Sequence, residues 1–176
     1  MLITPEYAEL NRRLHESDSN YGSKGSSAIR HLDTLHEKHG GVTVLDYGSG
    51  KGTLKYCLSI RSHKNPIYTV FNYEPALGID ERRPCDLVIC RAVLEHVEPD
   101  LIEDVLHDLR SCTLKVAYLC IGLRLSADIL PDGSNAHKII ESADWWEQKI
   151  SPYFIPYWRK HSKRKANFYV RPNVNQ

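Results

Sequence analysis

A short apolar segment that ends in a carboxylate and runs into three glycines constrains this 176-residue chain more than any other feature. Residues 42–46 are rich in β-branched side chains, which is typical of a buried strand. Gly48, Gly50 and Gly52 then permit a tight turn, and residues 53–60 have the pattern of a helix. This order predicts a ligand site at which backbone N–H groups of the helix N-terminus face the bound molecule.

The spacing of the glycines and the carboxylate before them restrict the ligand. A nicotinamide dinucleotide site has the pattern Gly-x-Gly-x-x-Gly, whereas this chain has Gly-x-Gly-x-Gly with Asp46 just before it. A carboxylate at this place favours a ligand with a positive ammonium group and disfavours a diphosphate, because like charges repel. We therefore expect a ligand with an ammonium end.

The rest of the hydrophobic pattern alternates strands with helices. Further strands are expected at residues 67–73, 85–90 and 114–121. Two aromatic-rich segments, 153–158 and 166–170, are expected to pair as an antiparallel hairpin. The pattern predicts an α/β fold with a mostly parallel sheet, a C-terminal antiparallel hairpin and a site at the carboxyl ends of the strands.

Capping residues indicate where the helices begin. Thr4 stands before a proline at the first helical position, which predicts an N-terminal helix. Asp100 and Glu103 fit an Asp-x-x-Glu capping box, and Ser142 is expected to cap a later helix.

Length and charge place further limits on the chain. A chain of 176 residues suits a single domain, residues 1–176. We divide it into an N-terminal helical cap (1–40), a cofactor-binding core (41–121) and a substrate-side part that ends in the closing hairpin (122–176). The formal net charge of +1 hides a gradient, because residues 1–150 carry 17 Lys and Arg against 22 Asp and Glu, whereas residues 151–176 carry six basic residues and no acidic one. The basic segment is either a surface for an anionic partner such as nucleic acid or a solvated hairpin.

Several classes of protein are disfavoured. No stretch reaches the roughly 18 consecutive apolar residues of a membrane helix, and the N-terminus lacks the layout of a signal peptide, so we expect a cytoplasmic protein without a membrane partner. The five cysteines form no Cys-x-x-Cys pair, which favours reduced thiols. The nine histidines are scattered, and no His or Asp pair has metal-ligand spacing on one element, so the sequence predicts no metal site.

Residues 20–121 resemble class I S-adenosylmethionine-dependent methyltransferases in three motifs that stand in the family's order. These are the glycine turn after Asp46, Glu74 at the end of the second expected strand, and residues 86–97, which resemble the family's fourth strand and its exit and include Cys90 and Arg91. The resemblance implies a Rossmann-like fold and S-adenosylmethionine as the cofactor. It implies that Asp46 and the glycines hold the methionine part, that Glu74 binds the ribose hydroxyls, and that Cys90 and Arg91 flank the cofactor.

The region after Glu74 departs from the family's pattern. Only eleven residues separate Glu74 from Asp86, too few for a helix, another strand and an acidic adenine loop, since a strand alone takes about five or six residues. One edge strand is therefore expected to be shortened or missing. The candidate cofactor-binding residues are Tyr21, Gly22, Asp46, Gly48, Ser49, Gly50, Gly52, Glu74, Ile79, Cys90 and Arg91.

Three of these candidates rest on position alone. Ile79 is the expected adenine contact. Tyr21 and Gly22 either close over the carboxylate of the cofactor or belong to a plain connecting loop.

A narrower resemblance is carried by three short segments. Residues 73–76, 93–99 and 130–137 are similar to a compact methyltransferase group frequent among bacteriophage and bacterial genes.

His137 is the candidate catalytic base or orienting group, because it lies just beyond a strand on the ligand side and imidazole titrates near neutral pH. Glu95 and His96 follow the other strand exit and are second candidates. A loop-stabilising hydrogen bond is the structural alternative for His137, and a place on a helix surface is the alternative for Glu95 and His96. The candidate substrate residues are Asp132, Asn135, Trp145, Trp146, Lys163 and Arg164, although one tryptophan is expected in the core because neighbouring helix positions point about 100° apart.

The sequence lacks the usual signatures of base-methylating enzymes. Residues 90–93 (Cys-Arg-Ala-Val) replace the Asp/Asn-Pro-Pro-Tyr/Phe motif, and Pro84-Cys85 stands before the strand instead of after it. The leading hypothesis is therefore methyl transfer to an oxygen or nitrogen of a small-molecule or nucleotide-like acceptor. The alternative is a scaffold subunit that binds S-adenosylmethionine or nucleic acid without chemistry of its own.

Overall fold

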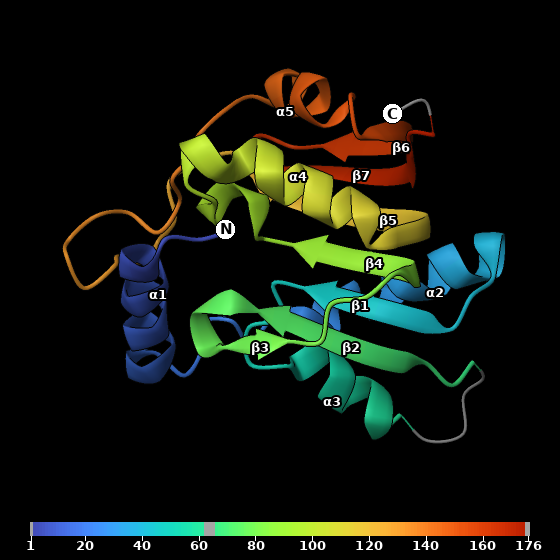
Figure 1. Cartoon of the computed structure of the whole chain (residues 1–176), viewed down its shortest axis with the longest axis horizontal. Coiled ribbons are helices and arrows are strands. Elements are labelled where there is room, and N and C mark those ends of the chain that lie inside the picture. Colours follow the sequence, from blue (N-terminus) through green and yellow to red (C-terminus); the bar gives the residue numbers. More distant parts are fainter. Residues whose placement is uncertain (1, 62–65, 175–176) are drawn as a thin grey trace.

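The computed structural model describes residues 2–61 and 66–174, which build one mixed sheet of seven strands (Figure 1). Its order is β3-β2-β1-β4-β5-β7-β6; β1, β2, β4 and β5 run parallel, and β7 is antiparallel to both β5 and β6. This confirms the predicted α/β fold with a C-terminal antiparallel hairpin. The strands are β1 (Thr43–Tyr47), β2 (Thr69–Glu74), β3 (Ile79–Asp80), β4 (Cys85–Arg91), β5 (Thr113–Gly122), β6 (Phe154–His161) and β7 (Lys165–Pro172).

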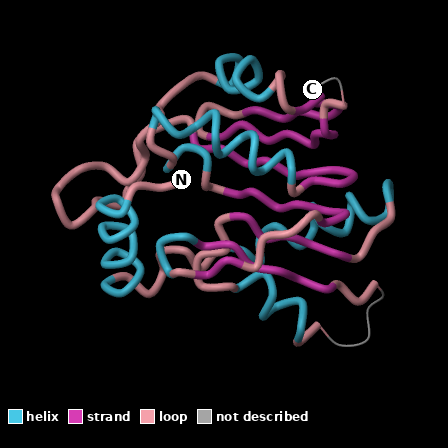
Figure 2. Tube along the Cα trace, in the orientation of Figure 1, coloured by secondary structure: helices cyan, strands magenta, loops and turns pink. Residues whose placement is uncertain are grey.

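Helices cover both faces of the sheet (Figure 2). Successive strand residues point to opposite faces, so Leu45 packs with α4 and α5 on one side while Val44 packs with α2 and α3 on the other. Trp146 of α5 is fully buried in the first of these layers, as expected for one of the two tryptophans. The helices are α1 (Pro5–Ser17), α2 (Ile29–His39), α3 (Thr53–Ser59), α4 (Ile102–Ser111) and α5 (Ala143–Ile150).

The edge of the sheet beside β2 is short, as predicted. β3 has two residues and pairs antiparallel to β2, with Ile79 opposite Glu74. A 3-10 turn, Pro75–Leu77, connects the two strands. The eleven residues between Glu74 and Asp86 therefore form a tight hairpin and no crossover helix.

Helix α1 stands beside the carboxyl ends of the parallel strands (Figure 1). Thr4 caps it as predicted, and the Thr4 backbone N–H and hydroxyl both donate to the carboxylate of Glu98, at 2.8 and 2.7 Å. The Tyr7 hydroxyl donates to the carbonyl of Ala136. These bonds fasten α1 to the loops that follow β4 and β5, so the helix closes one side of the space above the sheet.

The predicted caps of the two later helices have different outcomes. Ser142 caps α5 by accepting from the backbone N–H of Trp145. The capping box at Asp100 was wrong, because Pro99–Leu101 forms a 3-10 turn and α4 begins at Ile102 without a side-chain cap. Within residues 2–61 and 66–174, no helix is both long and apolar enough to cross a membrane.

Candidate functional site

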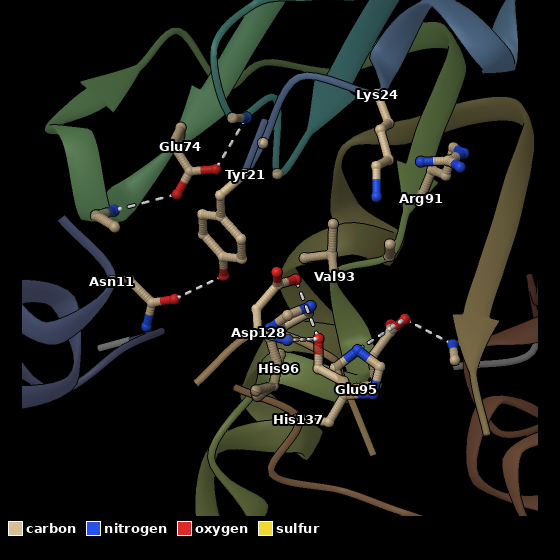
Figure 3. A pocket seen from close by; sticks show the side chains of 18 of the residues that line it. Asn11, Tyr21, Lys24, Glu74, Arg91, Val93, Glu95, His96, Asp128 and His137 are labelled. Carbon is tan, nitrogen blue, oxygen red and sulfur yellow. Dashed lines mark hydrogen bonds and ion pairs between the residues drawn. The ribbon is translucent and has the colours of Figure 1, made fainter. Parts of the chain in front are cut away.

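A cavity of about 750 Å³ lies at the carboxyl ends of β1, β2, β4 and β5, between the sheet and α1. Its size falls within the range of small-molecule sites, roughly 300–1,000 Å³. Side chains from several distant segments point into it (Figure 3). Glu74 and Tyr21 lie on one side, whereas Glu95, His96 and His137 gather on another.

The conformation of the glycine turn after β1 requires residues without side chains at two positions, Gly48 and Gly50. Gly48 and Gly50 have positive φ angles of 76° and 52°. A Cβ on Gly48 would lie 2.2 Å from Val93 Cγ2, and one on Gly50 would lie 2.4 Å from the Gly22 carbonyl oxygen. Only glycine fits such positions without displacing its neighbours.

The backbone N–H groups of this turn are already used by the protein, contrary to the sequence-based expectation that they face a ligand. The carbonyl of Tyr73 accepts from two of them, and Glu74, Gly22 and Ser49 each accept from one more. The turn therefore offers no free donors to a phosphate. The donors concerned are Gly48, Ser49, Gly50, Lys51 and Gly52.

Asp46 ends β1 with a carboxylate buried in the cavity wall. It is 4% exposed, and its Oδ2 has no hydrogen-bond partner in the part of the chain that is described. Burial raises the pKa of Asp46 to about 7, the nearby Glu74 adds to the rise, and Arg91 opposes it. The buried Ser49 hydroxyl beside it also has no partner within the described ranges. Buried polar groups are normally satisfied, so this pair points to a ligand with hydrogen-bond donors.

Glu74 ends β2 and is held by two backbone donors. Its Oε2 accepts from Gly50 N at 3.0 Å, and its Oε1 accepts from Ala76 N at 3.3 Å. Burial raises the pKa of Glu74, and the two N–H groups partly oppose this. Each carboxylate oxygen keeps a lone pair, so Glu74 can accept hydrogen bonds from a pair of ligand hydroxyls.

The loop between α1 and α2 docks directly on the glycine turn. The Gly22 carbonyl accepts from Lys51 N at 2.9 Å. The Tyr21 hydroxyl donates to Asn11 Oδ1 at 3.0 Å, and its ring lies edge-on to His15, with centroids 4.6 Å apart. Tyr21 and Gly22 thus line the cavity.

Three predicted cofactor residues stand behind the cavity wall. Gly52 is the N-cap of α3 with a φ of 67°, and Ile79 faces Glu74 across the β2–β3 ladder. Cys90 is 1% exposed, and burial raises the pKa of its thiol. Among the described residues, Pro75, Ala76 and Arg91 line the cavity at the neighbouring positions.

Glu95, His96 and His137 meet although they come from two segments. One ligand atom from each lies within 4.8 Å of the others. Glu95 Oε1 accepts from Gly122 N at 2.6 Å and lies 4.0 Å from His137 Nε2. Burial raises the pKa of Glu95, and burial together with His137 lowers the pKa of His96 to about 3, so the His96 ring is neutral.

No family model and no curated protein matches the sequence. The structure is similar to 1,6-didemethyltoxoflavin-N1-methyltransferase of Burkholderia thailandensis with bound 1,6-didemethyltoxoflavin and S-adenosylhomocysteine, at a TM-score of 0.65 and 15% identity over 98% of this chain and 92% of that one. It is also similar to the DhpI–SAH complex, at a TM-score of 0.63 and 17% identity over 96% and 97% of the chains. PH0226 from Pyrococcus horikoshii OT3 matches at a TM-score of 0.60 and 13% identity, covering 97% of both chains.

This chain has the class I methyltransferase fold. Its sheet order and its C-terminal hairpin are those of the fold expected from the three motifs. The cavity described above therefore occupies the carboxyl edge of a class I sheet, where ligands of open α/β sheets bind.

The predicted substrate residues are spread around this class I fold. Asn135 holds the loop by accepting from the backbone N–H groups of Ser126 and His137, both at 3.0 Å. The exposed Asp132 accepts from Ser134. Trp145 packs edge-on against Trp146, with centroids 5.0 Å apart. Of the six candidate substrate residues, all of which lie in the part of the chain that the structure describes, Arg164 alone lines the cavity.

Three residues of α1 also line the cavity, and none of them was predicted to do so. Tyr7, Asn11 and His15 recur every fourth residue, so they share one helix face, and all three are buried. Burial lowers the pKa of His15 to about 4, with Lys51 contributing. The sequence signal that could have predicted them is the occurrence of polar side chains every fourth residue on the otherwise apolar face of a helix.

Proposed function

We propose that the protein transfers a methyl group from S-adenosylmethionine to an oxygen or nitrogen of a small-molecule or nucleotide-like acceptor. One observation carries the proposal. Asp46 presents a buried carboxylate oxygen that has no partner among the described residues, beside a glycine turn whose N–H groups are already bonded within the protein. The site is thus suited to a cationic amino-acid end. Two of the similar solved structures, the Burkholderia methyltransferase and DhpI, are complexes with S-adenosylhomocysteine, which supports this choice.

The cavity residues fit this cofactor from one end to the other. Asp46 and the Ser49 hydroxyl would bind the amino-acid end, with Tyr21 and Gly22 covering it. Glu74 would accept from the ribose hydroxyls, and Ala76 lies next to it for the base. Gly48 and Gly50 would let the cofactor approach the backbone of the turn, because they carry no side chains. Gly52, Ile79 and Cys90 lie behind the cavity wall and would not contact the cofactor directly. When bound, S-adenosylmethionine supplies an electrophilic methyl group on a sulfonium.

The acceptor would bind near Glu95, His96 and His137. The carbonyl of Arg124 can only accept, so His137 Nδ1 carries the proton in their 2.5 Å bond, and Nε2 is the ring nitrogen that faces the cavity and Glu95. His137 is therefore proposed as the group that orients the acceptor or takes its proton. Methyl transfer then depends mainly on alignment of the acceptor, because it is an in-line displacement.

The cations that line the cavity would bind an anionic part of the acceptor, and the lining also holds the carboxylates of Asp18, Asp46, Glu74, Glu95, Glu98 and Asp128. Five basic residues line it, and none forms an ion pair with another described residue. Hydrogen bonds tie the basic hairpin to the loop after β5, because Leu123 N donates to Arg164 O and Arg124 Nε donates to Lys163 O. The five are Lys24, Arg91, Arg124, Arg164 and Lys165.

The double substitution Lys163→Ala with Arg164→Ala tests whether the hairpin binds polyanions. Binding of a fluorescent single-stranded oligonucleotide should weaken, and its salt dependence should flatten, because two phosphate contacts are lost. Fluorescence anisotropy at several salt concentrations measures both. Arg30→Ala with Lys38→Ala removes the same charge from α2 and should change neither property. Equal behaviour of the two double variants would assign the hairpin to solubility.

Isothermal titration calorimetry with S-adenosylhomocysteine and with S-adenosylmethionine tests the cofactor assignment. We expect saturable binding of both at one site per chain, in buffer with EDTA. Asp46→Ala should weaken both, whereas Asp100→Ala, which changes an exposed carboxylate, should weaken neither. Absence of binding by the intact protein would contradict the proposal.

Turnover decides between the enzyme and a non-catalytic scaffold. The basic hairpin and the absence of a base-methylation motif favour keeping the scaffold as the second candidate. Labelled methyl groups should pass from the cofactor to a pool of metabolites or nucleotides. Tight binding with no transfer to any pool would favour the scaffold. A cytoplasmic location and the three-part division of the chain remain predictions.

A further inference from the structure

A backbone carbonyl orients one imidazole of the cluster formed by Glu95, His96 and His137. Arg124 O accepts from His137 Nδ1 at 2.5 Å, and His137 Nε2 lies 4.0 Å from Glu95 Oε1. The His96 ring packs edge-on against the His137 ring, with centroids 4.6 Å apart. A histidine with one ring nitrogen bonded to a carbonyl and the other facing a carboxylate has the arrangement of metal-binding histidines.

Two polar atoms of this cluster are buried without a hydrogen-bond partner among the described residues. His96 Nδ1 and Glu95 Oε2 are buried and have no hydrogen-bond partner within residues 2–61 and 66–174. Glu95 is 1% exposed, so bulk water does not reach its side chain. One donor atom from each of the three side chains lies within 4.8 Å of the others, and a bound ion would give partners to the two atoms that have none.

Gly122 provides the space for this cluster. A Cβ at this position would lie 2.7 Å from His137 Cε1 and 2.8 Å from Glu95 Oε1. Its backbone N–H also fixes Glu95 Oε1, which leaves Oε2 for another partner. The three side chains line the cavity, so an ion among them would keep open positions toward a ligand (Figure 3).

We propose that Glu95, His96 and His137 bind one divalent transition-metal ion, with open coordination positions facing the cavity. Two imidazoles and one carboxylate are a donor set for Zn²⁺ or Fe²⁺, and Mg²⁺ prefers oxygen ligands. A tetrahedral ion at about 2.1 Å from its ligands holds them about 3.4 Å apart. Ligand atoms within 4.8 Å of one another reach this spacing by small side-chain rotations.

The ion would define the acceptor more narrowly. This step rests on the proposed methyl transfer, because the cluster lies on the side of the cavity away from Glu74. An open position on such an ion binds a hydroxyl or carboxylate oxygen of the acceptor. His137 then acts as a ligand and holds the acceptor through the ion.

Titration of Zn²⁺ into the metal-free protein, without cofactor, tests the site by calorimetry. The Cys57→Ser background removes the one described cysteine that is not buried. We expect one Zn²⁺ per chain and no comparable binding of Mg²⁺. His137→Ala should weaken Zn²⁺ binding by more than about 100-fold, as should Glu95→Gln, which keeps the oxygen that accepts from Gly122. His107→Ala, which changes an exposed histidine on α4, is the matched control and should bind as the parent does.

Crystals soaked in Zn²⁺ provide the second measurement, through anomalous scattering at the zinc edge. One peak among Glu95, His96 and His137 is the expected result. A melting curve for each variant separates loss of a ligand from loss of the fold. Failure of the parent to bind one Zn²⁺, or equal binding by His137→Ala, overturns the site. The titrations with S-adenosylhomocysteine contain EDTA, and the Zn²⁺ titrations contain no cofactor. Failure of the metal site can therefore be distinguished from failure of the cofactor site.

Discussion

Replacing Gly50 with alanine is expected to lower the affinity for S-adenosylhomocysteine by at least about 100-fold. The added Cβ would lie 2.4 Å from the carbonyl oxygen and 2.7 Å from the Cα of Gly22, both backbone atoms. The loop that carries Tyr21 must then move away from the turn and lose the bond from Lys51 N to Gly22 O. Alanine at a φ of 52° adds a strain of about 1–2 kcal/mol. Calorimetry measures the loss.

Gly78→Ala is the matched control for this prediction. Gly78 has a φ of 69° and a ψ of 20°, and a Cβ there would meet nothing within 4 Å. The variant has a comparable backbone strain without the collision, so it should bind the ligand nearly as the parent does. Equal losses in the two variants would mean that general destabilisation, and not closure of the loop on the turn, governs binding.

Asp46→Asn is expected to stabilise the free protein above pH 7 and to weaken ligand binding at the same time. The pKa of Asp46 is raised to about 7 in the folded chain from an ordinary 3.8, so the unfolded chain loses this proton first. The stability of the parent therefore falls as pH rises from about 4 to 7, by on the order of 4 kcal/mol in total. Asparagine does not ionise and avoids this loss.

Melting curves at pH 5 and pH 8 test this prediction. The melting temperature of Asp46→Asn should exceed that of the parent by roughly 8–16 °C at pH 8, with a smaller difference at pH 5. Asp100→Asn, at an exposed position, keeps Asp46 and should melt at the same temperature as the parent at both pH values. A variant less stable than the parent at pH 8 would show that the Asp46 carboxylate is stabilised in the free protein. S-adenosylhomocysteine should bind the variant more weakly, because the charge opposite its amino group is gone.

The parts of the site that were predictable depend on local pattern. Asp46, the glycine turn and Glu74 stand at strand ends that are visible in the sequence, and all lie at the cavity. The caps at Thr4 and Ser142 follow from single residues with a known conformational preference. At Asp100 the same rule failed, because Pro99 begins a 3-10 turn in place of the first turn of α4.

Contacts between distant segments were not predictable in this way. The N–H groups of the glycine turn are taken by Tyr73 and Glu74, which belong to another strand. Glu95 and His137 meet because the loop after β5 folds back over the exit of β4, where Glu95 O accepts from Lys138 N. No spacing along one element shows this. The metal-donor set is therefore visible only in three dimensions.

A crystal structure of the complex with S-adenosylhomocysteine tests the central proposal most directly. We predict that the amino group of the ligand contacts the Asp46 carboxylate, that the ribose hydroxyls contact Glu74, and that the sulfur faces the side of the cavity formed by Glu95, His96 and His137. A ligand bound elsewhere, or one whose amino group lies away from Asp46, would contradict the assignment of this cavity as a methyltransferase site.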